Sequence, residues 1–516
     1  MKKVDLKQRT KNSARNVIVG IVLNVLTILV GLVTQRIFLR ILNTEYLGLN
    51  SLFSNILTML SVAELGITNA VIFSMYKPLA EGDQKTIRAL LRFYRKWYTV
   101  IGCIILVLGL IILPFVPAIV GEQSLDINLY VIYAISLADI VLSYYLGYKR
   151  SIIIAAQQNY ILDLVQIGYI LSLSVLQMLA LFLTKNYYIY LIVRLTLRVL
   201  QNVGIIIIAN KKFPYITKPN PPELDEKMQK SIFKKIKGLV YHKIGGFIVL
   251  GTDNIIITTF LGLAVNGLYA SYYLIISALQ TIIMQCITVT TASVGNLLVK
   301  SDIKKQFEVF RRIRFINFCL ATVGSAGLLT VMSNFIEIWL GPEYVLGMSV
   351  LAALTLNFYF YVMRPSLAVF KEAAGIFHED RFIPIIESVL NIVVSIVLVK
   401  LIGLPGVFIG TFVSGLALYC FSYPKFVYHG IFKRSYRSYA FETIGYSLAA
   451  GIICCVTFYI AKGFSHMMWL EGIGVLISNI IISIVVPTII ILAVFANSDE
   501  MKYCRDLLKR FIKRGK

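Results

Sequence analysis

Long apolar runs separated by short polar loops occupy almost all of this 516-residue chain. A helix needs ~20 consecutive apolar residues to cross the hydrocarbon core of a bilayer. By this measure the pattern predicts about fourteen membrane-spanning helices, and hence an all-α polytopic membrane protein. The predicted spans are 17–42, 47–76, 97–120, 127–148, 161–184, 187–209, 239–261, 264–297, 316–340, 345–371, 383–403, 404–424, 441–462 and 470–495.

A long polar segment, residues 210–238, interrupts this pattern in the middle of the chain. Its prolines disfavour a continuous helix, and its many lysines predict a cytoplasmic position, because short basic loops stay on that side. We therefore expect four parts in the chain. They are an N-terminal six-helix lobe (1–209), the basic linker (210–238), a C-terminal six-helix lobe (239–425), and two additional helices with a basic tail (426–516).

The distribution of Lys and Arg supports this topology. Loops that follow even-numbered spans are rich in these residues, whereas the opposite loops are short and poor in them. Short basic loops remain in the cytoplasm, so both termini are predicted to be cytoplasmic. Three single lysines depart from the alternation: Lys185, Lys400 and Lys462.

The second half of the chain repeats features of the first half at a constant offset of 219 residues. The matching pairs are Gly48 and Gly267, Leu49 and Leu268, Asp83 and Asp302, Arg92 and Arg311, and Arg95 and Arg314. Six spans per half is an even number, so both copies have the same orientation in the membrane. This predicts a parallel repeat, related by an axis along the membrane normal. The last two spans have no counterpart.

Composition excludes several classes of protein. Hydrophobic residues make up 58% of the chain and charged residues 15%, which is far from the composition of a soluble domain. The net charge of +24 follows from the basic loops and suits anionic lipid headgroups, so we expect no nucleic-acid partner. The histidines and cysteines show no metal-ligand spacing, and no phosphate-binding loop occurs. We therefore expect no metal, no cofactor and no enzyme activity.

Ionisable residues inside spans are costly in hydrocarbon, and each is a candidate functional residue. Glu64 lies near the middle of the second predicted span. It is either a proton-titrating or cation-pairing group in a water-filled cavity, or a structural ion pair or interhelical hydrogen bond. Arg36 lies one turn deeper in the first span than Arg40. Arg40 is expected to snorkel, whereas Arg36 is the candidate cavity cation, with snorkelling as the alternative.

Further candidates lie in later spans. Asp139 is in the middle of the fourth span, and Arg194 and Arg198 share one face of the sixth. Asp253, in the seventh span, corresponds by the repeat to a position almost level with Arg36. Most of the candidate cations thus lie in the first half, and the second half contributes an acid. Mutual pairing is the alternative role for each of these residues.

Two segments resemble a known family. The run RIFLRILNTEYLGLNSLFSNILTMLSVAELGITNAV, Arg36–Val71, resembles the first two spans of bacterial polysaccharide repeat-unit flippases. The run Asp253–Leu279 resembles their seventh and eighth spans. These flippases belong to the multidrug/oligosaccharidyl-lipid/polysaccharide exporter superfamily. The likeness covers roughly the first twelve spans, and fourteen spans match flippases better than the twelve usual for drug exporters.

The resemblance implies a two-lobed transporter of the bacterial plasma membrane that works by alternating access. It would move undecaprenyl-diphosphate-linked oligosaccharide repeat units to the outer leaflet for capsule, O-antigen or related polymers. Arg36, Arg194 and Arg198 are the positions that would line its cationic cavity. Lipid II flippases cluster arginines in the first two spans, whereas span two here has Glu64, which disfavours lipid II as substrate. The implied partners are membrane lipids, a coupling proton or sodium ion, and polysaccharide polymerase machinery.

Two other functions remain as alternatives. A cation-coupled small-molecule (multidrug) antiporter would share the superfamily and the topology. An integral-membrane glycan polymerase or ligase is disfavoured, because such proteins typically need a sizeable external loop with catalytic residues, and the external loops predicted here are short.

Overall fold

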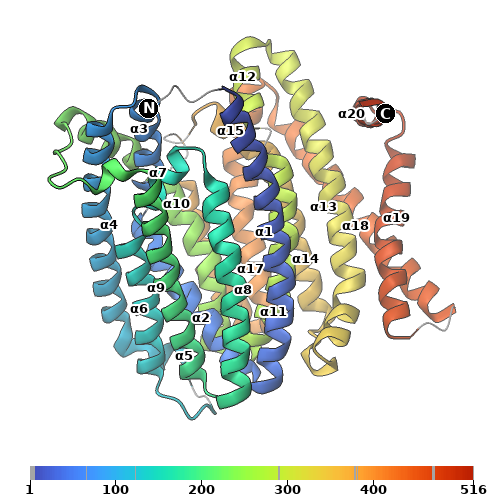
Figure 1. Ribbon diagram of the computed structural model, residues 1–516. Helices are drawn as coiled ribbons and strands as arrows, with labels where there is room; N and C mark the ends of the chain where they lie inside the picture. The colour runs from blue at the N-terminus through green and yellow to red at the C-terminus, as the bar shows by residue number, and fades with distance from the viewer. Residues whose placement is uncertain are drawn as a thin grey trace. The chain divides into compact units, whose positions relative to one another are not determined.

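The computed structural model describes residues 6–64, 67–121, 124–288, 291–376, 379, 382–467 and 471–514. Within these residues the chain is helical and contains no strand, which confirms the all-α fold (Figure 1). The long helices are α1 (Leu6–Ile41), α2 (Thr44–Leu60), α3 (Ile67–Glu81), α4 (Gln84–Ile112), α6 (Leu129–Gly147), α8 (Asn159–Thr184), α9 (Tyr187–Lys212), α10 (Glu226–Leu261), α11 (Leu263–Thr288), α12 (Thr291–Lys300), α13 (Ile303–Trp339), α14 (Met348–Met363), α15 (Pro365–Ala373), α16 (Ile383–Ile402), α17 (Leu404–Ala417), α18 (Tyr436–Met467), α19 (Ile473–Val494) and α20 (Asp499–Arg514).

Eleven helices of the described chain are long and apolar enough to cross a membrane. The predicted span 47–76 is not among them, because it is divided into α2, a 3₁₀ turn at Ser61–Glu64, and α3. The predicted span 345–371 is likewise divided between α14 and α15, where Pro365 follows Arg364. Proline cannot donate the backbone hydrogen bond that continues a helix, so a break at this point has a local cause. The number of fourteen spans stays a prediction.

The chain forms two compact units, Met1–Leu274 (unit 1) and Ile275–Lys516 (unit 2). In unit 1, α8 packs along both α1 and α9, and α6 packs against α4 and α9. In unit 2, α13 packs against α14, α18 and α19, and α16 packs along α17. The sequence-predicted division into lobes at the central linker stays a prediction.

The start points of the helices follow the predicted repeat. α2 and α11 begin at Thr44 and Leu263, α4 and α13 begin at Gln84 and Ile303, and α6 and α14 begin at Leu129 and Met348. In each pair the second helix begins 219 residues after the first. The repeated aspartates also have the same role. The side chain of Asp83 accepts a hydrogen bond from the backbone N–H of Thr86, and that of Asp302 accepts one from the backbone N–H of Lys305. Both are N-caps, the position that aspartate favours.

The repeated glycines mark a close helix crossing within unit 1. A Cβ added to Gly48 would lie 2.0 Å from the carbonyl oxygen of Leu263, and one added to Gly267 would lie 2.0 Å from that of Thr44. Thr44 and Leu263 are themselves separated by the repeat offset. The starts of α2 and α11 therefore meet through equivalent residues, as the two partners of a two-fold contact do.

Part of the predicted central linker is helical. Residues Pro214–Thr217 form a 3₁₀ turn and an irregular segment follows, but α10 begins at Glu226 and runs through the rest of the predicted linker. All four linker prolines precede this helix, so none opposes it. Arg88 and Arg92 on α4 hold the irregular segment by donating to backbone carbonyls, including that of Pro221 at 2.7 Å.

Replacing Gly48 tests the helix crossing. Gly48→Ala is expected to lower the melting temperature of the detergent-purified protein, because the new methyl group meets a backbone carbonyl that cannot rotate away. Overpacking of this kind costs ~1–3 kcal/mol. Gly168→Ala in α8 is the matched control, since no atom lies within 4 Å of its added Cβ. That variant should be neutral or stabilised by up to ~1 kcal/mol, as alanine is the better helix former. Equal melting temperatures for both variants would contradict the close crossing.

Candidate functional site

Unit 1 contains a group of charged residues between its helices. Arg194 and Arg198 lie one turn apart on α9 and face Asp139 on α6. The Nε atom of Arg194 lies 3.5 Å from Asp139 Oδ2, and that of Arg198 lies 3.6 Å from Oδ1. The side chains of Asp139, Arg194 and Arg198 are 14%, 18% and 30% exposed. The sequence-predicted residues of spans four and six therefore meet, and they form one cluster.

Neighbouring helices complete this cluster. Arg194 donates to Asn50 Oδ1 on α2 at 3.0 Å, and the guanidinium of Arg198 lies over the ring of Tyr169 on α8, 4.8 Å from its centroid. Two guanidinium groups share one carboxylate, so the three ionised groups leave a net positive charge. Asp139 Oδ1 and Arg194 Nε are buried, and neither has a hydrogen-bond partner in the described part of the chain.

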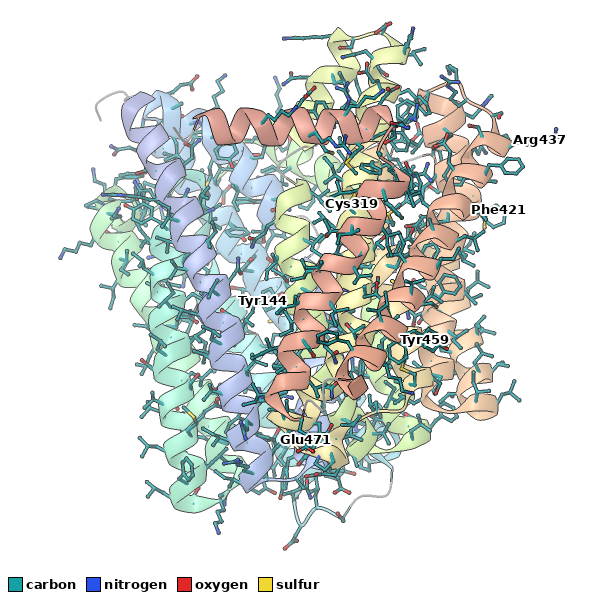
Figure 2. The ribbon with its side chains drawn as sticks, turned by 90° about the vertical axis from the view of Figure 1, so that its right-hand side faces the viewer. Tyr144, Cys319, Phe421, Arg437, Tyr459 and Glu471 are labelled. Carbon is teal, nitrogen blue, oxygen red and sulfur yellow. The ribbon has the colours of Figure 1, made fainter. Side chains whose placement is uncertain are left out.

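Glu64 lies in a second polar group of unit 1, which consists of hydroxyls. Tyr98 on α4 donates to its Oε1 at 2.5 Å, and Tyr144 on α6 donates to its Oε2 at 2.7 Å (Tyr144 is labelled in Figure 2). Thr68 on α3 also donates to Oε1, and Tyr94 donates to the hydroxyl of Thr68 at 2.8 Å. The three tyrosines are at least 92% buried. We call Glu64, Thr68, Tyr94, Tyr98 and Tyr144 the hydroxyl cage.

The hydroxyl cage bears directly on the two roles predicted for Glu64. No Lys or Arg nitrogen of the described side chains lies within 4.0 Å of its carboxyl group, so the structure shows hydrogen bonds and no ion pair there. Hydroxyl groups rotate, and they can donate to a carboxylate or accept from a carboxylic acid. The cage therefore accommodates both protonation states of Glu64. Its location at the 3₁₀ turn that divides α2 from α3 places the group at a break in the helix.

The remaining candidates occupy different environments. Arg36 is exposed on unit 1, on the same stripe of α1 as the exposed apolar residues Leu29 and Val33. It does not join the cluster of Asp139, Arg194 and Arg198. Asp253 lies on α10 and is buried, with 7% of its surface exposed. That Arg36 faces an aqueous cavity stays a prediction.

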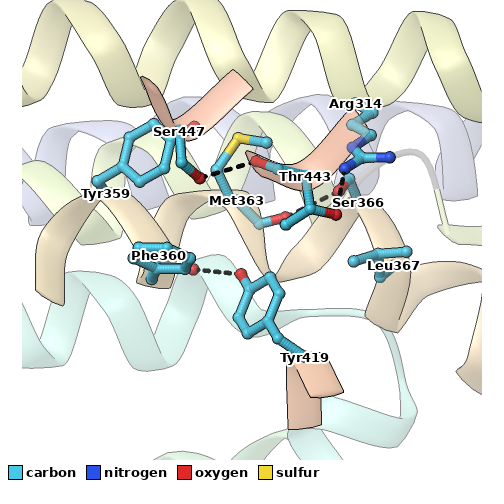
Figure 3. A pocket seen from close by; sticks show the side chains of 9 residues that line it. All are labelled: Arg314, Tyr359, Phe360, Met363, Ser366, Leu367, Tyr419, Thr443 and Ser447. Atoms are coloured by element: carbon cyan, nitrogen blue, oxygen red, sulfur yellow. Dashed lines mark hydrogen bonds between the residues drawn. The ribbon is translucent and has the colours of Figure 1, made fainter. Parts of the chain in front are cut away.

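Unit 2 contains a buried arginine, Arg314, that the sequence pattern did not place inside a span. Arg314 is counted with the basic loop residues in the pattern, but it lies in α13 and is 2% exposed. It donates to Tyr428 and to Thr443 Oγ1 at 2.8 Å, and it lies 3.1 Å from Glu442 Oε2. Arg314 and Thr443 also line a cavity of about 10 Å³, enough for one water molecule (Figure 3).

A second ion pair of unit 2 joins Arg364, at the break between α14 and α15, to Glu387 of α16 at 3.2 Å. The repeat could have indicated that Arg314 lies inside a helix. Its counterpart Arg95 also belongs to a helix that continues into a span. The sequence indicated the pairing roles of Glu442 and Glu387 less clearly, since each is a single acid near the end of an apolar run.

Comparison with known proteins decides the family. A model of the family described as "Polysaccharide biosynthesis protein" matches residues 13–291, more than half of the chain. The chain belongs to this polysaccharide biosynthesis family. No curated protein sequence matches the chain.

Solved structures show the same fold. The lipid II flippase MurJ in an inward closed conformation matches with a TM-score of 0.65 and 14% identity, over 93% of this chain and 99% of MurJ. An inward-facing multidrug resistance MATE family transporter of the MOP superfamily matches with a TM-score of 0.57 and 13% identity. The match covers 76% of this chain and 92% of that transporter. A MOP superfamily transporter from Pyrococcus furiosus matches with a TM-score of 0.53 and 12% identity. The match covers 81% of this chain and 96% of that transporter. This polysaccharide biosynthesis family member therefore has the MurJ/MATE-type fold of an integral membrane protein.

The cluster around Asp139 gives a testable expectation. Asp139→Asn leaves two guanidinium groups without a counter-charge, and removal of one partner of a buried pair costs ~3–5 kcal/mol. The residual exposure of both arginines places the expected loss at the lower end of this range. The melting temperature should fall, and Arg198→Gln in the same chain should recover part of the loss. Asp126→Asn, which changes an exposed carboxylate outside the spans, is the control and should melt like the parent protein. An additive effect of the two cluster substitutions would show that they are not coupled.

Proposed function

We propose that this protein is a flippase that moves undecaprenyl-diphosphate-linked oligosaccharide repeat units from the cytoplasmic to the outer leaflet of the bacterial plasma membrane. It works by alternating access and supplies capsule, O-antigen or a related polymer. Family membership and the MurJ/MATE-type fold support this role. In this proposal both termini are cytoplasmic, the protein makes and breaks no covalent bond, and a polymerase uses the exported unit.

The observation that carries the choice of substrate is the excess positive charge inside unit 1. Arg194 and Arg198 share the carboxylate of Asp139, and their contacts of 3.5 Å and 3.6 Å are longer than good hydrogen bonds. A diphosphate offers stronger acceptors, because a guanidinium fork matches the spacing of phosphate oxygens. Binding of a diphosphate beside this cluster would satisfy N–H groups that Asp139 leaves without a hydrogen bond. Arg36 is proposed as a further cation on the path of the substrate.

A cation-coupled multidrug antiporter is the second candidate, and the hydroxyl cage is the observation on which it rests. A carboxyl group that accepts hydrogen bonds and forms no ion pair can attract an organic cation or a proton. The same group serves the flippase equally well as the coupling site, so it does not by itself separate the two functions. A glycan polymerase is disfavoured, because within the described residues only short segments connect the spans on the predicted outer side.

The diphosphate proposal is tested by binding of farnesyl diphosphate, a short soluble analogue of the carrier lipid, to the purified protein. Arg194→Gln and Arg198→Gln should each weaken binding about tenfold, since a hydrogen bond to a charged group contributes ~1.5–3 kcal/mol. Arg36→Gln should also weaken the binding of farnesyl diphosphate. Arg40→Gln, at the predicted outer end of the same helix, is the matched control. Equal affinity for farnesol, which lacks the diphosphate, would contradict the role of the arginines.

The coupling role of Glu64 is a separate prediction. In the proposed cycle Glu64 gains a proton from the outer side and loses it to the inner side, and this biases the two states of the transporter. Glu64→Gln keeps the shape of the side chain and removes the titration. The variant should fold, insert and translocate at a rate that no longer depends on an imposed proton gradient in proteoliposomes.

The control for this substitution is Tyr144→Phe, which removes one hydroxyl donor and leaves the carboxyl group able to titrate. That variant should retain a dependence on the gradient. If Glu64→Gln translocates normally and stays responsive to the gradient, Glu64 is not the coupling group. If Glu64→Gln does not accumulate in the membrane, the hydroxyl cage has a structural role.

A further inference from the structure

A pocket with a volume of about 340 Å³ lies in unit 2 between α13, α18 and α19. Lys462 and Ser465 of its lining are close to the end of α18, and Asn479 is in the second turn of α19. The pocket is therefore beside the connection between the two additional helices. In the predicted topology this end of the helices faces the outer surface, opposite to α20 (Figure 2, where Glu471 marks the connection).

Polar side chains from all three helices build this pocket. The amide of Asn479, which is 5% exposed, donates to the carbonyl oxygen of Thr330 at 3.1 Å and to Asn334 Oδ1 at 3.1 Å. The hydroxyl of Ser465 lies 3.5 Å from Asn479 Oδ1. Polar groups in a membrane protein are costly unless they are hydrogen-bonded, and this network holds the three helices in register around a polar space.

Lys462 supplies the charge of the pocket. It is exposed, and no carboxylate of the described residues lies within 4.0 Å of its amino group. The lining contains no acidic residue. Lys462 also departs from the charge alternation of the loops, because it lies at a predicted outer end where lysine is rare. An isolated ammonium group beside amide and hydroxyl groups is suited to an anionic ligand such as a phosphate.

The surroundings of the pocket point to a ligand with acyl chains. The lining itself contains apolar side chains of both additional helices, namely Phe458 and Ala461 of α18 and Val475 of α19. Tyr459, which is 71% exposed, adds an aromatic side chain of the kind that gathers at membrane interfaces (Figure 2). A phosphate at Lys462 would thus lie beside apolar side chains of two helices.

We propose that this pocket binds the phosphodiester headgroup of a glycerophospholipid in the outer leaflet, with Lys462 as the phosphate ligand. A volume of about 340 Å³ is at the lower end of the range for ligand pockets and admits a glycerophosphate group. It is too small for an oligosaccharide diphosphate. The site is therefore distinct from the path proposed for the lipid-linked substrate, and it assigns a lipid-binding role to the two helices without a counterpart in the repeat.

The experiment measures binding of phosphatidylglycerol to the purified full-length protein by native mass spectrometry, with the first bound lipid as the readout. Lys462→Gln should weaken this binding about fivefold, which corresponds to the ~1 kcal/mol that one lysine contributes near an anionic lipid. Lys462→Arg keeps the charge and should bind within about twofold of the parent protein. Lys185→Gln removes an exposed lysine at another predicted outer helix end and should leave the binding unchanged.

Three further probes decide the identity of the ligand. Diacylglycerol lacks the phosphate, and sn-glycerol 3-phosphate lacks the acyl chains, so both should bind much more weakly than phosphatidylglycerol. Equal binding of sn-glycerol 3-phosphate would overturn the lipid assignment in favour of a free phosphate ester. Tighter, Lys462-dependent binding of undecaprenyl phosphate would overturn it in favour of the carrier lipid. Unchanged phosphatidylglycerol binding to Lys462→Gln would overturn the site itself, whatever the result for farnesyl diphosphate.

Discussion

Charged side chains inside a membrane protein must be paired or hydrogen-bonded, and this constraint shapes both units of the structure. In unit 1, Asp139 lies between Arg194 and Arg198, and Glu64 is surrounded by the hydroxyls of Thr68, Tyr98 and Tyr144. In unit 2, Arg314 meets Glu442 and Arg364 meets Glu387. Each group joins residues from different helices, so satisfying the charges also fixes how those helices face one another.

The two groups of unit 1 differ in what they leave unsatisfied. The cluster around Asp139 has more cations than anions and contains buried donor and acceptor atoms without hydrogen bonds. The hydroxyl cage holds one acid whose two oxygens both accept hydrogen bonds. In the proposed mechanism the two groups have different roles. The cluster around Asp139 attracts the diphosphate, and the hydroxyl cage carries the proton. Separate groups allow each function to be removed without the other.

The helical, membrane-spanning character of this fold could be predicted from the sequence, because the length of a span is set by the thickness of the bilayer. The 219-residue offset also predicted that Asp83 and Asp302 are equivalent, and the structure shows both as N-caps. Hydropathy did not reveal the turn at Glu64, since apolar residues continue on both sides of it. Nor did it identify Tyr98 and Tyr144 as partners of Glu64, because the choice of partner depends on how separate helices are rotated in the packed unit. The burial of Arg314 was missed for the same reason, since a basic residue just inside a helix end looks like part of the loop.

The central claim, that the substrate is a lipid-linked oligosaccharide, is tested most directly by reconstitution. Proteoliposomes would contain undecaprenyl-diphosphate-linked repeat units, and a membrane-impermeant glycosidase would report how much glycan becomes newly accessible over time. Uptake of ethidium by the same vesicles, under the same ion gradients, would report antiport of a small cation. The account predicts protein-dependent exposure of the glycan with no protein-dependent movement of ethidium. Ethidium transport without any change in glycan exposure would contradict it.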